Sequence, residues 1–261
     1  AFGNLGVQSL GIKGIAIAIL LTITVRSIIF LCLLRQREFS GITIYNSTWE
    51  QGVNDPWRIM KIGVPLGLTE ISNHGSLAAI GLLVSQLGIV ALAAHNIAFN
   101  IFALTHMLVF GLSRATVIRM GQLNGGHVQI SNLRLLLLTS IVVALTLSLA
   151  PALTLYFQAT NIANYYSTDP EVVNLVASLL ILITFVRIID DVALVLQGAL
   201  EGLQKTRQIF KVRASCQWLI GLTSGLLFSQ WLGLQGFWMG IGLALLCVVI
   251  LFAKALHKAL K

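Results

Sequence analysis

Long apolar stretches separated by short polar gaps make up most of this chain. Each stretch holds about 20 or more mainly apolar residues, which is the length that an α-helix needs to cross a bilayer. The stretch LRLLLLTSIVVALTLSLAPALTLYF has no polar face at a period of 3.6 residues, as a helix of a water-soluble core would have. The pattern therefore predicts an all-α membrane protein with seven transmembrane helices, at residues 12–34, 59–84, 89–113, 133–157, 172–200, 208–231 and 235–256.

The composition agrees with lipid as the solvent. Of the 261 residues, 57% are hydrophobic and 10% are charged, whereas a soluble domain carries about 25% charged residues. Cys32, Cys216 and Cys247 stand alone in apolar runs, which indicates neither a disulfide framework nor a metal site. We expect these three cysteines to be small buried hydrophobic residues.

Basic residues alternate along the gaps between the apolar stretches. The gaps SQLG, QATNIANYYSTDPE and QWLGLQG contain none, whereas the other gaps and the C-terminal tail contain several. The positive-inside rule for short loops places the basic gaps and the C-terminus in the cytoplasm. The net charge of +8 is then a topology signal, and nucleic acid is not an expected partner. The basic residues of these gaps and of the tail are Arg35, Arg37, Arg58, Lys61, Arg114, Arg119, Arg134, Lys205, Arg207, Lys211, Arg213, Lys254, Lys258 and Lys261.

Glycines recur four residues apart within the apolar stretches. Such spacing lets helix backbones approach closely in lipid and favours a packed bundle. The pairs are Gly63 with Gly67, Gly198 with Gly202, Gly221 with Gly225, and Gly236 with Gly240.

Three ionisable residues, Arg187, Asp190 and Asp191, interrupt the apolar run 172–200. Ionisable groups at this depth are expensive and usually functional. Arg187 can pair with Asp190 at i+3 or with Asp191 at i+4. Because neighbouring helical residues point about 100° apart, the two acids cannot face the same way. We expect Asp191 to hold Arg187, and Asp190 to face a cavity as a cation or proton site.

A second polar group lies in the stretch 59–84, where Glu70, Asn73 and His74 share one helix face. Pro65 is expected to kink this helix. At a rise of about 1.5 Å per residue, Glu70 lies ~13 Å from Lys61, and the acids at 190 and 191 lie ~15–16 Å from Glu201. The carboxylates thus fall at similar depth and are expected to line one cavity.

Interpretations in which these polar residues have only a structural role stay open. Glu70 can be a protonated carboxyl bonded to His74, and the two side chains alone do not make a metal site. Arg26, inside the first stretch, can snorkel or pair with an acid elsewhere. A third polar group, His95, Asn96 and Asn100, with His106 on a similar face, fits interhelical packing as well as a cavity lining.

Three segments resemble the multidrug and toxic compound extrusion (MATE) transporters in order and spacing, over about residues 57–250. They are KIGVPLGLTEISNHGSLAAIGLLVSQLGIVALAAHNIAFNI, RATVIRMGQLNG and STDPEVVNLVASLLILITFVRIIDDVALVLQGALEGLQKTR. The most specific parts are LGIVALAAHNIAFN and GALEGLQKTR with its upstream Asp.

The resemblance implies half of a twelve-helix fold built from two six-helix bundles. Residues 1–39 would be the last helix of the N-terminal bundle, 40–56 a cytoplasmic linker, and 57–261 the C-terminal six-helix bundle. The N-terminal bundle would be a missing partner. The chain starts at Ala1 without Met, and we expect it to begin partway through a longer protein.

The resemblance also implies a secondary active transporter that exports organic cations, drugs or other amphipathic compounds in exchange for Na⁺ or H⁺, with no other cofactor. Asp190 matches the family's coupling acid in the tenth helix. The matching acid of the seventh helix falls on Asn73, so Glu70 one turn earlier is expected to replace it. This departure favours proton coupling or a shifted site, and the Pro expected in the eighth helix is absent from HMLVFGLSRA.

Other function classes fit less well. A seven-helix receptor or photoreceptor is suggested by helix count alone. A retinal protein needs a Lys in mid-helix, and the last two spans have none there, since Lys254 is at the terminal edge. A lipid-linked precursor flippase of the same superfamily would need several Arg in its cavity, and only Arg187 and Arg26 are available. No nucleophile, metal or phosphate-loop motif indicates an enzyme. We therefore expect an integral membrane transporter, placed in the bacterial inner membrane with a cytoplasmic C-terminus.

Overall fold

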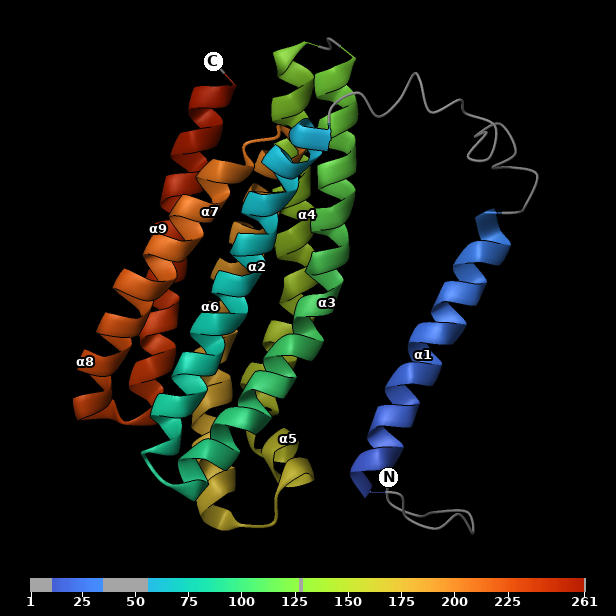
Figure 1. Cartoon of the computed structure of the whole chain (residues 1–261). Helices are drawn as coiled ribbons and strands as arrows, with labels where there is room; N and C mark the ends of the chain where they lie inside the picture. Colours follow the sequence, from blue (N-terminus) through green and yellow to red (C-terminus); the bar gives the residue numbers. More distant parts are fainter. Residues whose placement is uncertain (1–10, 35–55, 127–128, 261) are drawn as a thin grey trace. The chain divides into compact units, whose positions relative to one another are not determined.

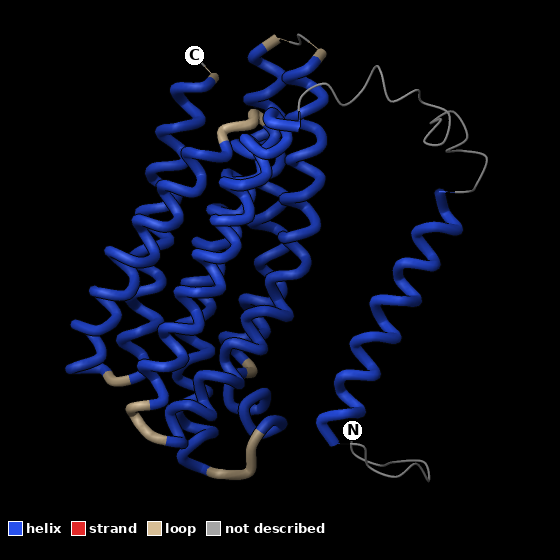
Figure 2. Tube along the Cα trace, viewed as in Figure 1, coloured by secondary structure: helices blue, strands red, loops and turns tan. Residues whose placement is uncertain are grey.

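The computed structural model describes residues 11–34, 56–126 and 129–260. Wherever the backbone is described, it forms helices joined by short turns (Figure 2). The chain divides into two units, Ala1–Pro56 and Trp57–Lys261. The second unit covers the residues expected to form the six-helix bundle. The expected linker, 40–56, lies outside the described residues except for Pro56.

The first unit contributes one described helix, α1, from Gly11 to Leu34. Large apolar side chains along it are exposed within its own unit, including Leu20 and Phe30. Cys32 is exposed as well. The expectation that all three cysteines are buried is wrong for Cys32, because no other described helix of this unit covers it. Cys216 is buried as expected and Cys247 is half-buried.

The second unit is a bundle of long, roughly aligned helices (Figure 1). Its elements are α2 (Pro56–Ser85), α3 (Ile89–Gly125), α4 (Ile130–Phe157), α5 (Ala159–Tyr166), α6 (Pro170–Gly202), α7 (Thr206–Ala214), the π-helix η2 (Ser215–Leu222), α8 (Thr223–Leu232) and α9 (Leu234–Ala259).

The central helix of this unit is α6, which packs against α3, α4, α5 and α9. It begins with Asp169 accepting a bond from the Glu171 amide and with Pro170 in its first turn, both common at helix starts. Every side chain from Ala193 to Leu200 is buried. Arg187, Asp190 and Asp191 are buried as well, so the ionisable residues in the middle of α6 are enclosed by protein.

Two apolar clusters fill the bundle above and below the middle of α6. One includes Leu180, Ile183 and Trp238, and the other includes Ile209 and Phe252. The polar residues of α6 lie between these clusters. Outside, large apolar side chains such as Leu104, Leu138 and Phe185 are exposed, and so extensive an apolar surface suits lipid rather than water.

The expected helices are found with three differences. Five described helices, α1, α3, α4, α6 and α9, are long and apolar enough to cross a membrane by length and composition. α2 is 30 residues long but carries the polar group around Glu70. The sixth expected span, 208–231, is divided among α7, η2 and α8. α3 continues to Gly125, so Arg114 and Arg119 lie on a helix rather than in a loop.

Glycine pairs bring helices together at three of the four expected places. A Cβ added to Gly240 would lie 2.5 Å from the Cα of Gly225, and one added to Gly198 would lie 2.7 Å from the Ser113 carbonyl oxygen. Gly202 is equally tight against α3. Gly63 and Gly67 have no described neighbour within 4 Å of such an atom, so this pair brings no described helices together.

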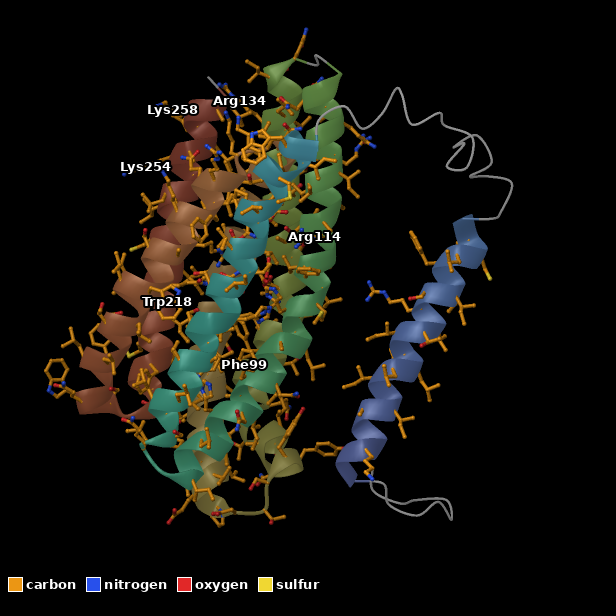
Figure 3. The ribbon with its side chains drawn as sticks, viewed as in Figure 1. Phe99, Arg114, Arg134, Trp218, Lys254 and Lys258 are labelled. Atoms are coloured by element: carbon orange, nitrogen blue, oxygen red, sulfur yellow. The ribbon has the colours of Figure 1, made fainter. Side chains whose placement is uncertain are left out.

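One end of the second unit carries Arg134, Lys254 and Lys258 (Figure 3) and is called the basic end below. The Arg134 guanidinium donates to the Leu260 carbonyl there, over 2.7 Å. The opposite end carries α5 and the turns before α3 and α9 (Figure 1).

Candidate functional site

Asp190 lies in the middle of α6 and is 7% exposed. Its carboxylate sits between two other helices. The Oδ2 atom is 3.1 Å from Nδ1 of His106 on α3, and Oδ1 is 3.8 Å from Nη1 of Arg213 on α7. A carboxylate with one titratable partner and one permanent cation is therefore held at the junction of three helices.

Asp191 has a separate set of contacts. Its Oδ1 is 3.0 Å from Nη2 of Arg187, and both side chains are fully buried. The Ser148 hydroxyl of α4 donates to the other carboxylate oxygen, and Arg187 also donates to the Thr105 carbonyl over 2.6 Å. Of the two pairings left open by the sequence, the structure shows Arg187 with Asp191.

Hydrogen bonds continue from Arg213 toward the basic end. The Arg213 Nε donates to Gln197 over 2.8 Å, and the Gln197 amide donates to Glu201 over 2.9 Å. Arg114 on α3 donates to the same carboxylate over 3.0 Å. These contacts form a polar chain that joins α3, α6 and α7. Its members are Asp190, Arg213, Gln197, Glu201 and Arg114.

The expected polar group on α2 is split by the structure. The buried face of α2 carries Thr69, Ser72 and Ser76, and Trp218 of η2 donates to Ser72 over 3.0 Å (Figure 3 labels Trp218). Glu70 and His74 are exposed on this unit, and Asn73 is half-buried. The three residues lie on one helix, but their side chains are not buried to the same extent.

Glu70 nevertheless belongs to the surroundings of Arg213. Its carboxylate is close enough to attract the Arg213 guanidinium electrostatically. No ion pair or hydrogen bond joins Glu70 to His74 in the part of the chain that the structure describes, so the protonated-carboxyl alternative gains no support. The Oδ1 atom of Asn73 is buried without a hydrogen-bond partner among the described residues, so it is available as an acceptor.

Pro65 does not interrupt α2, which continues through it as one helix. The Thr69 hydroxyl donates to the Pro65 carbonyl over 2.8 Å. A proline at position 65 leaves the carbonyl of residue 61 without its helical N–H donor. The Thr69 bond adds a donor to the carbonyl of Pro65, one turn further along.

The polar residues early in α3 lie away from Asp190. His95 is buried, with its ring 5.8 Å from that of Trp238, as expected for packing. Asn100 accepts a bond from the Tyr166 hydroxyl over 3.3 Å, and Asn96 is exposed. At ~1.5 Å per residue, Asn96 and Asn100 lie ~15 and ~9 Å along the helix from His106. They would line any cavity at a different depth from Asp190.

Sequence reasoning missed Arg213 and undervalued His106. Arg213 was counted among basic loop residues, yet it is 5% exposed and lies inside the bundle. Thr206, Ile209 and Arg213 are buried at a helical spacing, so the periodicity of TRQIFKVRA could have shown that Arg213 shares the inward face. No group of three or more His, Cys, Asp or Glu side chains able to hold a metal occurs in the described residues.

Comparison with known families identifies this arrangement. A family model described as MatE matches residues 65–227, which include Asn73, Asp190 and Arg213. The chain belongs to the MATE family of transporters. Membership of a transporter family agrees with the expectation that the chain is not an enzyme.

Relatives of this MATE chain include multidrug resistance proteins MdtK from two Yersinia species. The protein of Yersinia enterocolitica serotype O:8 / biotype 1B is 33% identical over 267 residues, covering 97% of this chain and 56% of the relative. That of Yersinia pseudotuberculosis serotype O:1b is 33% identical over 266 residues, covering 96% and 56%. The chain thus spans about half the length of these relatives.

Solved structures show the same fold. The Vibrio cholerae MATE transporter VcmN in the bent form matches with a TM-score of 0.80 at 20% identity, covering 96% of this chain and 56% of that one. An outward-facing multidrug resistance MATE transporter of the MOP superfamily matches with a TM-score of 0.83 at 19% identity, covering 97% and 57%. The all-α membrane fold and the family resemblance expected from the sequence are confirmed.

Proposed function

We propose that this chain is part of a secondary active efflux transporter that exports organic cations, drugs or other amphipathic compounds in exchange for H⁺ or Na⁺. The MdtK relatives, which are named multidrug resistance proteins, support the substrate class. The observation that carries cation coupling is Asp190, a buried carboxylate in the bundle core that faces His106 and Arg213 from two other helices. Such groups in membrane proteins mark ion pathways.

The proposed mechanism is competition for one negative site. Asp190 is the main coupling residue, and two residues of α2 support it: Asn73 through its unpartnered Oδ1 atom, and Glu70 through its electrostatic attraction for Arg213. A coupling cation that neutralises Asp190 lowers the affinity for a cationic substrate, which then leaves. Binding must differ between the two access states, because a ligand with equal affinity for both shifts nothing.

Supporting roles follow from the remaining contacts. The Arg187–Asp191 pair, closed by Ser148, is proposed to fix α6 against α3 and α4 rather than to bind an ion. His74, Asn96 and Asn100 are proposed to line the cavity against the N-terminal bundle, which would be supplied by the rest of the protein.

The flippase alternative loses support. Arg187 is fully buried and paired with Asp191, and Arg213 faces Asp190. The arginines inside the described bundle are thus bound to acids instead of lining a site for an anionic lipid precursor.

The test uses the full-length protein that contains this chain, in everted membrane vesicles under an imposed pH or Na⁺ gradient. Asp190→Asn should lower drug transport to the background of vesicles without the protein, while the amount in the membrane stays normal. Asp169→Asn is the matched control, since it makes the same change at an exposed helix cap where Asn also caps well. Normal transport by Asp190→Asn would refute the assignment, and the gradient that drives wild-type transport identifies the ion.

The same vesicles test the proposed membrane orientation. We propose a bacterial inner membrane location with the basic end and the C-terminus in the cytoplasm, as the positive-inside rule favours. A protease added outside everted vesicles should remove a C-terminal tag. Protection of the tag there, with cleavage in right-side-out vesicles, would reverse the orientation.

A further inference from the structure

Arg213 is held beside Asp190 by contacts that do not depend on Asp190. Its Nε donates to Gln197 over 2.8 Å, and its guanidinium lies 5.9 Å from the Phe252 ring centre. These contacts keep a permanent positive charge within reach of the Asp190 carboxylate at all times, because an arginine does not lose its proton in proteins.

The contact between Arg213 and Asp190 is the longest of the three arginine–acid pairs among the described residues of the bundle. The nitrogen–oxygen distance is 3.8 Å there, against 3.0 Å for both Arg187–Asp191 and Arg114–Glu201. At 3.8 Å the two groups attract each other without a well-formed hydrogen bond. Asp190 is therefore the acid from which an arginine can most readily be displaced.

A second carboxylate is available to a displaced Arg213. Asp191 and Glu201 each have an arginine of their own, whereas Glu70 makes no ion pair among the described residues and attracts Arg213 electrostatically. The groups that act on Asp190 are His106 from α3, Arg213 from α7, and Arg187 and Asp191 from its own helix, with Glu70 of α2 acting on Arg213.

We infer that Arg213 is a positioning residue that acts as a tethered counter-cation of Asp190. It neutralises the carboxylate when no coupling ion is bound, and the incoming ion displaces it toward Glu70. Arg213 thereby sets how tightly the coupling ion binds. This inference rests on the proposed role of Asp190 and adds a determinant of ion affinity on a different helix.

The test measures the concentration of coupling ion that gives half-maximal drug transport by the full-length protein in proteoliposomes. Arg213→Gln removes the competitor, so this concentration should fall about tenfold or more, which corresponds to the loss of one charge contact. Glu70→Gln should change it in the opposite direction, because Arg213 then has only Asp190 to neutralise. Arg119→Gln is the control, since Arg119 is exposed and donates only to Gln122 among the described residues, and it should leave the value unchanged.

Tighter ion binding separates this role from a purely structural one. Loss of packing lowers the maximal rate or the yield of protein, but it does not increase affinity for an ion. If Arg213→Gln does not accumulate, Arg213→Met removes the same charge with an apolar side chain that suits the buried position, and its half-maximal concentration should also lie below that of wild type. An unchanged or raised value in the variant that accumulates overturns the inference.

The two proposals fail in different ways. If Asp190→Asn still transports, the proposed coupling role fails. If Asp190→Asn is inactive and the Arg213 variant binds the ion no more tightly than wild type, only the counter-cation role fails.

Discussion

Asp190 and Asp191 are adjacent in the sequence but have different partners in the structure. Asp191 is closed off with Arg187 and Ser148 on one side of α6, whereas Asp190 faces His106 and Arg213 on another. The rotation of about 100° between neighbouring helical residues is sufficient to separate them. These contacts fit the proposed division of roles, in which Asp191 stabilises the bundle and Asp190 exchanges partners.

The buried Arg187–Asp191 pair gives a prediction about stability. Arg187→Met leaves Asp191 buried without its cation, which should destabilise the protein by about 3–5 kcal/mol. Thermal unfolding of the purified full-length protein in detergent measures this. Adding Asp191→Leu to Arg187→Met should recover most of the loss, because no unpaired charge then remains in the core.

Arg119→Met is the matched control for this prediction. Arg119 is exposed and hydrogen-bonded to Gln122, so its replacement should change stability by about 0–1 kcal/mol. An unfolding temperature of Arg187→Met equal to that of this control would show that the pair does not stabilise the bundle.

The local half of the site was predictable from the sequence and the interhelical half was not. The i+3 and i+4 spacings limited the partner of Arg187 to Asp190 or Asp191, because all three residues belong to one helix, and the structure shows the expected one, Asp191. The contacts of Asp190 with His106 and Arg213 join residues far apart in the chain. No periodicity within one helix specifies which residue of another helix faces it, so these partners needed the packed structure.

At the scale of elements, α6 and the glycine contacts organise the bundle. Hydrophobic length predicted the long helices well because each is a nearly continuous apolar run. It did not predict that the sixth span contains the π-helix η2, which begins two residues after Arg213. Such π segments are rare and are frequently found near functional sites, which agrees with the placement of Arg213 at the end of α7.

The contact between α8 and α9 gives a prediction at this scale. Gly240→Ala would place a Cβ 2.5 Å from the Cα of Gly225, and backbone cannot move aside as a flexible side chain can. We expect a loss of about 1–3 kcal/mol, as for other overpacked interiors, measured as a lower unfolding temperature of the full-length protein.

Gly81→Ala serves as the control for Gly240→Ala. Gly81 lies within α2 with no described atom within 4 Å of a new Cβ. Alanine there should be neutral or stabilising by about 0.5–1 kcal/mol, because glycine is a poor helix former. Equal unfolding temperatures for the two variants would show that the α8–α9 contact tolerates a wider spacing.

At the scale of the whole molecule, the chain spans about half the length of its MdtK relatives. The order and spacing of the motifs predicted this, because they resemble the second half of the family's fold. The second unit, Trp57–Lys261, holds Asp190, Arg213 and Glu70 together. We propose that the cavity wall facing Glu70 and His74 belongs to the rest of the protein, so transport itself has to be measured on the full-length chain.

Competition between substrate and coupling ion for Asp190 can be observed directly, without a membrane gradient. An amphipathic organic cation is added to purified full-length protein in weakly buffered detergent solution, and the release of protons, or of preloaded Na⁺, is recorded. Wild type and Asp169→Asn should release the coupling ion when the substrate binds, and Asp190→Asn should release none. Release from Asp190→Asn equal to that from wild type would show that the ion binds elsewhere.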